Sequence, residues 1–140
     1  MVRFEHYALN VAAPHAIANW YVETLGCRVI FKLDSEPFTV FLGDGEGRVF
    51  WEIYRNPKVP FSEVRDAEPL MYHLAFAVED AEAVKAKVIE AGGSFVEELR
   101  TDSGSHLVMM RDPWGIALQL CQRVPPFLPP AAEPAPEART

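Results

Sequence analysis

The chain has 140 residues, of which 49% are hydrophobic and 24% charged, and its net charge at pH 7 is −7. Such a composition is typical of globular proteins, and the length suits one compact domain or two small units that share a core. An acidic chain without a basic patch excludes nucleic acid and anionic membrane surfaces as expected partners. No run approaches the ~20 apolar residues that a membrane span needs.

Two features bear on the compartment. The N-terminal sequence MVRFEHYALNV alternates polar and apolar residues and lacks the unbroken apolar run of a signal peptide. The only two cysteines, Cys27 and Cys121, do not make a disulfide framework. The sequence therefore predicts a cytoplasmic protein.

The first half of the chain predicts a strand, a helix and three further strands. FEHYALNV alternates at period two, as a half-buried strand does. Pro14 then opens a helical stretch, and Gly26 stands where a left-handed helix stop is expected. Asp44-Gly45 is typical of a turn between strands. The three strands are expected at roughly 28–33, 37–42 and 48–55.

The second half repeats this order after a linker, 56–69, that holds three prolines. MYHLAFAV alternates as a strand, and Asp80 is a candidate N-cap for the helix that two glycines end. A turn is expected at residues 112–115, and the proline-rich segment 124–140 is predicted to be a disordered tail. The predicted strands are 94–98, 105–111 and 115–122, which gives modules over 1–55 and 70–123.

An internal repeat with an offset of 67 residues relates the two halves without a gap. The offset aligns the apolar pattern, a glycine and two polar positions: Val11 with Val78, Gly26 with Gly93, His6 with His73, and Glu52 with Gln119. The predicted fold is therefore α+β, with two tandem βαβββ modules. Together they are expected to form an eight-stranded mixed sheet that encloses a cleft, with the helices outside.

Strand alternation predicts that His6, Glu52, His73 and Gln119 share the concave face, opposite the side that packs on the helices. Two imidazoles, a carboxylate and an amide are ligands for one divalent metal ion, which we expect to be Ni, Zn, Fe, Mn or Co. The alternative is that each residue is only a hydrogen-bonded pocket group. Placing Glu52 in an apolar cleft is costly without a cation, which favours the metal.

The segments GRVFWEIYRN and MRDPWGIALQL, each in the fourth strand of a βαβββ module, resemble those of the vicinal oxygen chelate superfamily. This group includes glyoxalase I, methylmalonyl-CoA epimerase, extradiol dioxygenases, and the fosfomycin and bleomycin resistance proteins. The resemblance covers residues 3–122 and implies the ligand set His6, Glu52, His73 and the residue at 119. Similar glyoxalases carry Glu at that last position, and bacterial ones often carry Arg where this chain has Asn10. Both departures count against glyoxalase I itself.

The predicted function is a glyoxalase-like, metal-dependent lyase or isomerase that stabilises an enolate or enediolate of a small substrate with vicinal oxygens. Glu52 is the candidate general base, because the amide of Gln119 cannot accept a proton at neutral pH. Two alternatives stay open. One is a non-catalytic small-molecule or antibiotic binder of the bleomycin-resistance type, and the other is an Fe(II)-dependent dioxygenase that uses His6, His73 and Glu52.

A homodimer with sites shared between subunits is also expected, since each module leaves sheet edges and a half-apolar face that need cover. His6 and Glu52 would then come from one chain, and His73 and Gln119 from the other. Pairing of the two modules within one chain remains open, because a 14-residue linker can span tens of ångströms. His106 follows a Gly-Ser loop and is interpreted as an exposed hairpin histidine.

Overall fold

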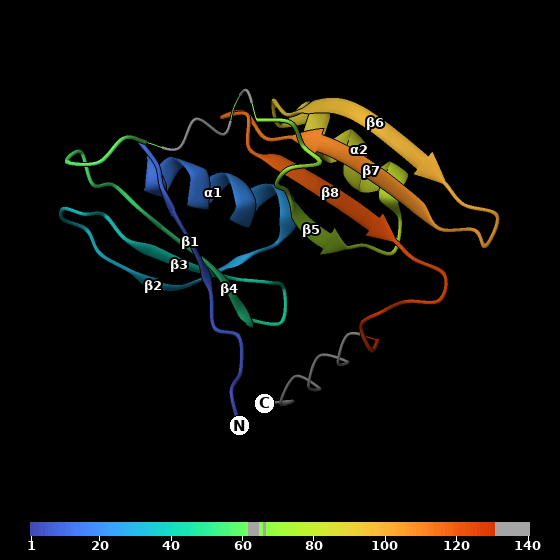
Figure 1. Ribbon diagram of the computed structural model, residues 1–140, viewed down its shortest axis with the longest axis horizontal. Coiled ribbons are helices and arrows are strands. Elements are labelled where there is room, and N and C mark those ends of the chain that lie inside the picture. The colour runs from blue at the N-terminus through green and yellow to red at the C-terminus, as the bar shows by residue number, and fades with distance from the viewer. Residues whose placement is uncertain (62–64, 66, 131–140) are drawn as a thin grey trace, which may run out of the picture.

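The computed structural model describes residues 1–61, 65 and 67–130 (Figure 1). Its element order repeats a strand, a helix and three strands twice, so the predicted α+β class and the tandem βαβββ modules are confirmed. The first module contains β1 (Tyr7–Asn10), α1 (Pro14–Leu25), β2 (Arg28–Lys32), β3 (Val40–Gly43) and β4 (Val49–Tyr54). The second contains β5 (Leu74–Ala77), α2 (Ala81–Glu90), β6 (Ser94–Arg100), β7 (His106–Arg111) and β8 (Ala117–Gln122).

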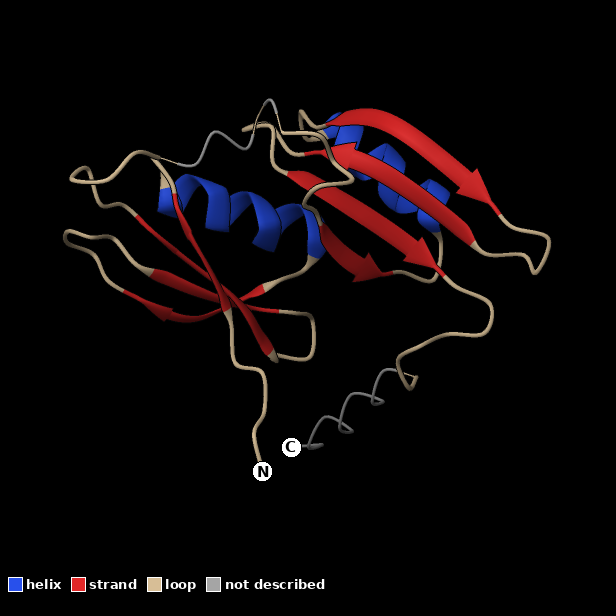
Figure 2. Ribbon diagram, in the orientation of Figure 1, coloured by secondary structure: helices blue, strands red, loops and turns tan. Residues whose placement is uncertain are grey.

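The eight strands divide into two four-stranded mixed sheets, which Figure 2 shows as separate layers. Their strand orders are β1-β4-β3-β2 and β5-β8-β7-β6, and only the β1–β4 and β5–β8 pairs are parallel. The registers match at the 67-residue offset, because Ala8 pairs with Glu52 and Ala75 pairs with Gln119. The repeat is therefore structural as well as sequential, while enclosure of a cleft stays a prediction.

Both helices begin and end as the sequence predicts. Pro14 opens α1, and Gly26 closes it in the left-handed conformation with φ 70°, its N–H donating to the Val22 carbonyl at 3.1 Å. The Asp80 carboxylate caps α2 by accepting from the Ala83 N–H at 2.9 Å. These helix ends determine where the chain leaves each helix to start the next strand.

The core confirms the alternation predicted for the fourth strands. Trp51 and Ile53 of β4 and Leu118 and Leu120 of β8 are fully buried, while Glu52 and Gln119 between them are only half-buried. Tyr7 of β1 pairs with the buried Trp51 in the parallel register, although 43% of its own surface is exposed. β1 is an edge strand that pairs with β4, and the Tyr7 ring lies 5.4 Å from that of Tyr72.

Tyr21 of α1 joins the two modules. Its ring contacts Trp51 of the first module at 5.1 Å and Phe76 of the second at 6.1 Å between centroids. The Tyr21 hydroxyl donates a 3.0 Å hydrogen bond to Oδ2 of Asp112 in the β7–β8 turn. A second connection runs from the Trp20 indole N–H to the Ala91 carbonyl at 2.8 Å. Figure 1 shows α1 lying beside β5 of the second module, in agreement with these contacts.

Asp112 also organises the turn that the sequence predicts at residues 112–115. Its Oδ1 accepts from the backbone N–H groups of Trp114 and Ile116, both at 2.9 Å. Burial raises the pKa of Asp112 to about 6, although the hydrogen bonds from Ile116, Tyr21 and Trp114 lower it. Burial, with the nearby Asp112 charge, also raises the pKa of the Tyr21 hydroxyl well above its usual value. At neutral pH the buried pair therefore holds one negative charge, shared through a hydrogen bond.

The linker begins at a polar anchor on β1. The Asn10 amide donates to the Asn56 carbonyl at 3.0 Å, and its oxygen accepts from the Asn56 N–H at 2.7 Å. The predicted linker includes residues 62–64 and 66, and the predicted disordered tail includes 131–140, all of which lie outside the described residues. Residues 123–130 contain no helix or strand. The module boundaries stay predictions. No helix in the described part of the chain is long and apolar enough to cross a membrane.

Candidate metal centre

The first module brings two of the predicted ligands into contact. His6 lies directly before β1, and its Nε2 is 3.2 Å from Oε2 of Glu52 in the neighbouring strand β4. The parallel register explains this contact, because Ala8 stands opposite Glu52 and His6 is two residues earlier on the same face. Both side chains are about a quarter exposed, at 27% and 22%, so solvent and small ligands can reach them.

Aromatic rings surround this pair on the concave side. The His6 ring meets Phe41 of β3 edge to face, with centroids 5.2 Å apart. Phe41 stands opposite Glu52 in the antiparallel register and contacts Phe31 of β2 at 6.1 Å. Phe31 is 50% exposed. The polar pair therefore lies at the edge of an apolar, solvent-exposed face, where a ligand with an apolar part would find contacts.

The second module places His73 and Gln119 at equivalent backbone positions, but no hydrogen bond joins these two described side chains. The His73 Nδ1 lies 2.8 Å from the Pro69 carbonyl oxygen. Gln119 is half-buried, and its Oε1 accepts a 3.3 Å hydrogen bond from the Cys121 thiol. Burial raises the pKa of that thiol, so it stays protonated at neutral pH and keeps this bond.

Within a single chain the predicted ligands form two half-sites. His6 and Glu52 are in contact. Among the described residues, the one group of three His, Cys, Asp or Glu side chains with ligand atoms within 4.8 Å of one another does not include His6, Glu52 or His73. His73 therefore brings no nitrogen to within 4.8 Å of both His6 and Glu52. Each half-site has one imidazole and one oxygen donor. A four-ligand centre therefore requires the concave faces of a first and a second module to meet.

The chemistry of the half-sites fits a divalent ion. Imidazole nitrogens, one carboxylate and one amide oxygen form a mixed set suited to a first-row transition metal or zinc. The Nδ1 of His6 is buried without a hydrogen bond of good geometry, although Oε2 of Glu5 lies 3.3 Å away. The His6 ring is thus held by contacts at its Nε2 edge and its face, and Nε2 already faces an anionic oxygen.

A second group of metal-binding residue types lies on the helix side of the second module. Glu82, Glu98 and His106 each bring one ligand atom to within 4.8 Å of the others. Nζ of Lys85 already stands 3.3 Å from Glu82 and 3.5 Å from Glu98, where a metal ion would have to displace it. Hydrogen bonding from His106 and the nearby Lys85 charge lower the pKa of Glu98. We interpret the group as an ion-pair network.

The interpretation of His106 as an exposed hairpin residue is wrong. Only 3% of its surface is accessible, and its Nε2 lies 2.6 Å from Oε2 of Glu98 on the adjacent strand. His106 starts β7 opposite Arg100, so its side chain falls between the sheet and α2. The sequence carried a signal for this, since His106 alternates with Val108 and Met110, which are both fully buried.

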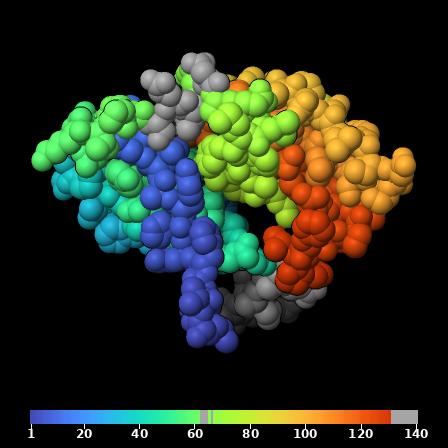
Figure 3. All heavy atoms as spheres, viewed as in Figure 1, coloured from blue at the N-terminus to red at the C-terminus, as the bar shows by residue number. Residues whose placement is uncertain are grey.

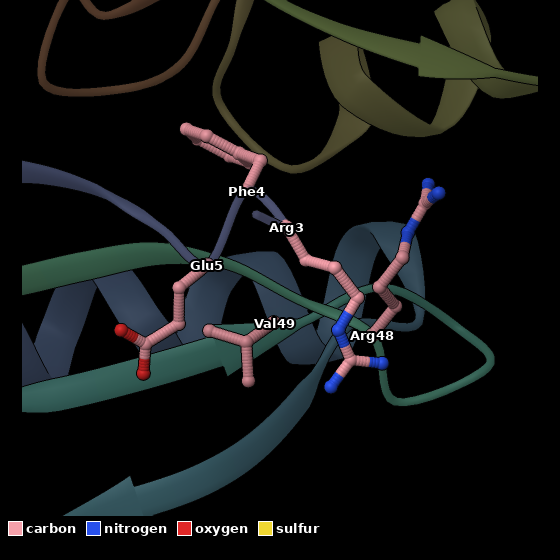
Figure 4. A pocket seen from close by; sticks show the side chains of 5 residues that line it. All are labelled: Arg3, Phe4, Glu5, Arg48 and Val49. Carbon is pink, nitrogen blue, oxygen red and sulfur yellow. The ribbon is translucent and has the colours of Figure 1, made fainter. Parts of the chain in front are cut away.

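A cavity of about 480 Å³ lies next to the first half-site and is lined by Arg3, Phe4, Glu5, Arg48 and Val49. Figure 3 shows the N-terminal segment that forms one wall lying on the surface of the molecule. In Figure 4 the Arg3 and Arg48 side chains point in opposite directions, and Arg48 is paired with Asp44 at 3.2 Å. The two guanidinium groups therefore do not form a common anion clamp.

The family model of the Glyoxalase/Bleomycin resistance protein/Dioxygenase superfamily matches residues 3–120. The chain belongs to this superfamily, as its paired βαβββ modules and concave-face histidines had indicated. A search of curated proteins returned no match.

Solved structures of the same fold include two with glyoxalase names. A glyoxalase family protein from Enterococcus faecalis is 27% identical, with a TM-score of 0.60 over 86% of this chain and 97% of its own. A glyoxalase I mutant from Zea mays is 25% identical, with a TM-score of 0.65 over 86% of this chain but only 45% of its own. TnmS3, an antibiotic-binding protein from Streptomyces sp. CB03234, is 17% identical, with a TM-score of 0.63 over 87% of this chain and 96% of its own.

Proposed function

We propose that the protein is a glyoxalase-like, metal-dependent enzyme of the lyase or isomerase type that acts on a small molecule with two adjacent oxygens. His6, Glu52, His73 and Gln119 would hold one divalent ion among Ni, Zn, Fe, Mn and Co. When bound, the ion would supply the positive charge that stabilises an enolate or enediolate. The observation that carries this proposal is the 3.2 Å contact between His6 Nε2 and Glu52 Oε2 at the open face of a superfamily member.

Glu52 is the group that moves the proton in this proposal. Its carboxylate is partly exposed and lies beside the exposed aromatic face, so it can reach a carbon acid bound there. Gln119 occupies the equivalent position of the second module but cannot accept a proton, because its amide oxygen is a very weak base. A single base on one side of the site would remove a proton and return it to a neighbouring atom.

We also propose that the working unit is a homodimer with two shared sites. Three observations support it: the ligands form two half-sites, the edge strands β1 and β5 each have one neighbour, and both outer strands expose apolar side chains. On the concave faces these side chains are Phe31, which stands opposite Phe41, and Leu99, which stands opposite Leu107. A second copy that faced its second module to this first module would bring His73 and Gln119 to His6 and Glu52, and would bury both apolar faces.

A non-catalytic binder is the second candidate, and the exposed aromatic face favours it. Phe31 and Phe41 offer an apolar surface to an organic molecule whether or not a metal binds. TnmS3 has the same fold and is an antibiotic-binding protein. In this case His6 and Glu52 would serve as hydrogen-bonding groups for the ligand.

Metal content separates the two candidates. The protein is expressed in cells and purified without chelators, and its metals are measured by elemental analysis beside the His73→Ala and His106→Ala variants. The enzyme proposal predicts about one divalent ion per chain in the wild type and in His106→Ala, and loss of most of it in His73→Ala. A wild-type protein that neither contains a divalent metal nor takes one up on titration would favour the binder.

A further inference from the structure

His6 and His73 stand at the same place in the two modules, directly before the first strand, and each has an acceptor near its Nδ1. This inference rests on the proposed metal centre. We propose that Glu5 and the Pro69 carbonyl are positioning groups that engage Nδ1 of His6 and His73, respectively. Nε2 of each ring is thereby left to bind the divalent ion.

The tautomer of His73 follows from its partner. A carbonyl oxygen can only accept, so the 2.8 Å contact with Pro69 requires a hydrogen on Nδ1. In the neutral ring the lone pair then lies on Nε2. The acceptor is held firmly, because Pro69 is buried and the Glu68 carbonyl accepts from the Met71 N–H at 2.9 Å in the same turn. The second half-site therefore has its ligand atom selected by the backbone.

The same segment is also anchored to the sheet. Arg111 at the end of β7 donates from Nη2 to the Ala67 carbonyl at 2.7 Å and from Nη1 to the Gly115 carbonyl at 2.9 Å. These bonds connect the end of the linker to the strand pair that carries Gln119. The position of the Pro69 carbonyl is thus set relative to both ligands of the second module.

His6 has a weaker version of this arrangement. Its Nε2 faces Glu52 at 3.2 Å, and its Nδ1 is 3.3 Å from Oε2 of Glu5 without a well-formed hydrogen bond. The Glu5 side chain is 78% exposed, so a small rotation can close this contact. Nδ1 is buried, and Glu5 is the acceptor beside it. A carboxylate at this position orients the ring and raises the basicity of Nε2.

The first test reads the tautomers in metal-free protein, at a pH where the imidazoles are neutral. Two-bond ¹H–¹⁵N NMR spectra distinguish hydrogen on Nδ1 from hydrogen on Nε2. His73 is expected to carry it on Nδ1. His15 is the internal control with the opposite expectation, because its Nε2 lies 2.9 Å from the Leu33 carbonyl. The His73→Gln and His15→Gln variants assign the signals. Hydrogen on Nε2 of His73 would overturn the proposal even if no metal ever binds.

The second test measures zinc affinity in Glu5→Ala, Glu5→Gln and a control, Glu79→Ala, which removes an exposed charge beyond β5. Loss of an outer partner of a ligating histidine weakens binding by about 10- to 100-fold, and we expect this loss in Glu5→Ala only. Glu5→Gln keeps an acceptor oxygen and should lose less. Equal affinity in the wild type and Glu5→Ala would refute the role of Glu5. A wild type that binds no zinc would refute the metal centre itself. The NMR test of the His73 tautomer would then still decide whether the Pro69 carbonyl engages Nδ1 of His73.

Discussion

The two modules share a backbone but differ in the chemistry they present. At the same register position β4 carries Glu52 and β8 carries Gln119, so the first half-site holds a carboxylate and the second an amide. His6 contacts its oxygen partner, whereas His73 is bonded to the backbone. The repeat therefore preserves the position of each proposed ligand, while the charge at that position differs. A site built from both modules would have one basic side and one neutral side.

The concave faces of the two modules also differ in solvent exposure. Around Gln119 the side chains of Met109, Ala117 and Cys121 are almost fully buried, at 2%, 3% and 6% exposure. Around Glu52 the aromatic face stays open, with Phe31 half exposed. The open face and the proposed base, Glu52, therefore lie on the same module.

Replacing the carboxylate of the first half-site should have the largest effect. Glu52→Gln makes the two half-sites alike and removes the only carboxylate of the proposed ligand set, so the affinity for a divalent ion is expected to fall by roughly 100-fold or more. Isothermal titration with zinc measures it, and circular dichroism checks that the fold is kept. Gln119→Ala is the matched control and should lose much less. Similar losses in the two variants would mean that the modules contribute equally.

The connection between the modules should make stability depend on pH. Burial raises the pKa of Asp112 from its usual 3.8 to about 6, so the folded state favours the protonated form. This stabilisation is fully present below pH 4 and is lost as pH rises to about 6, a change on the order of 2–3 kcal/mol. Urea unfolding of the wild type and Asp112→Asn at pH 4, 5, 6 and 7 measures the difference. A pH-independent difference would contradict the assignment.

Removing the hydroxyl at the same connection should have a slightly smaller effect. Tyr21→Phe leaves Oδ2 of Asp112 buried without its donor, which costs about 1–3 kcal/mol of unfolding free energy at neutral pH. Because one partner is already lost, Tyr21→Phe should cost less in an Asp112→Asn background. Urea unfolding of the four proteins gives this coupling. Additive effects would show that the hydrogen bond does not link the modules.

Much of this architecture could be predicted from the sequence, because it is set by local patterns. Period-two alternation placed Trp51 and Leu118 in the core and Glu52 and Gln119 on the other face, and the 67-residue offset anticipated the matching registers. Pro14, Gly26 and Asp80 marked the helix ends for the same reason, since capping depends on neighbouring residues.

The features that could not be predicted depend on how one module packs on the other. Tyr21 lies in the predicted helix and Asp112 in the predicted turn, but nothing local indicated that the two would meet across the molecule at 3.0 Å. The partner of His106 was missed for a similar reason, as Glu98 lies on a different strand. The convergence of His6 and Glu52 with His73 and Gln119 remains a prediction, because it requires faces of two modules that a single chain leaves apart.

Adding a carboxylate to the second half-site should have a smaller effect of opposite sign. Gln119→Glu gives both modules an anionic oxygen, and the extra charge is expected to raise the zinc affinity by about tenfold. The Cys121 thiol keeps an acceptor in this variant, because a carboxylate oxygen can accept its hydrogen bond as the amide oxygen does. Zinc titration is the readout. Weaker binding in Gln119→Glu would place position 119 outside the metal centre.

The smallest change is expected at the ion-pair network of the second module. Glu82→Gln removes a charge that pairs with Lys85 and Arg100 at the surface, and such pairs contribute little. Zinc stoichiometry and affinity should match the wild type. A lost zinc equivalent would instead make Glu82, Glu98 and His106 a metal site, and would move the centre away from the concave faces.

The central claim is that one complete site takes His6 and Glu52 from one chain and His73 and Gln119 from another. The direct measurement mixes His6→Ala protein with His73→Ala protein under conditions of verified subunit exchange and determines bound zinc. Each mixed dimer should regain one of its two sites, whereas His6→Ala mixed with Glu52→Ala should regain none, because both changes lie in the same module. No recovery of zinc in the first mixture, despite exchange, would contradict the shared site.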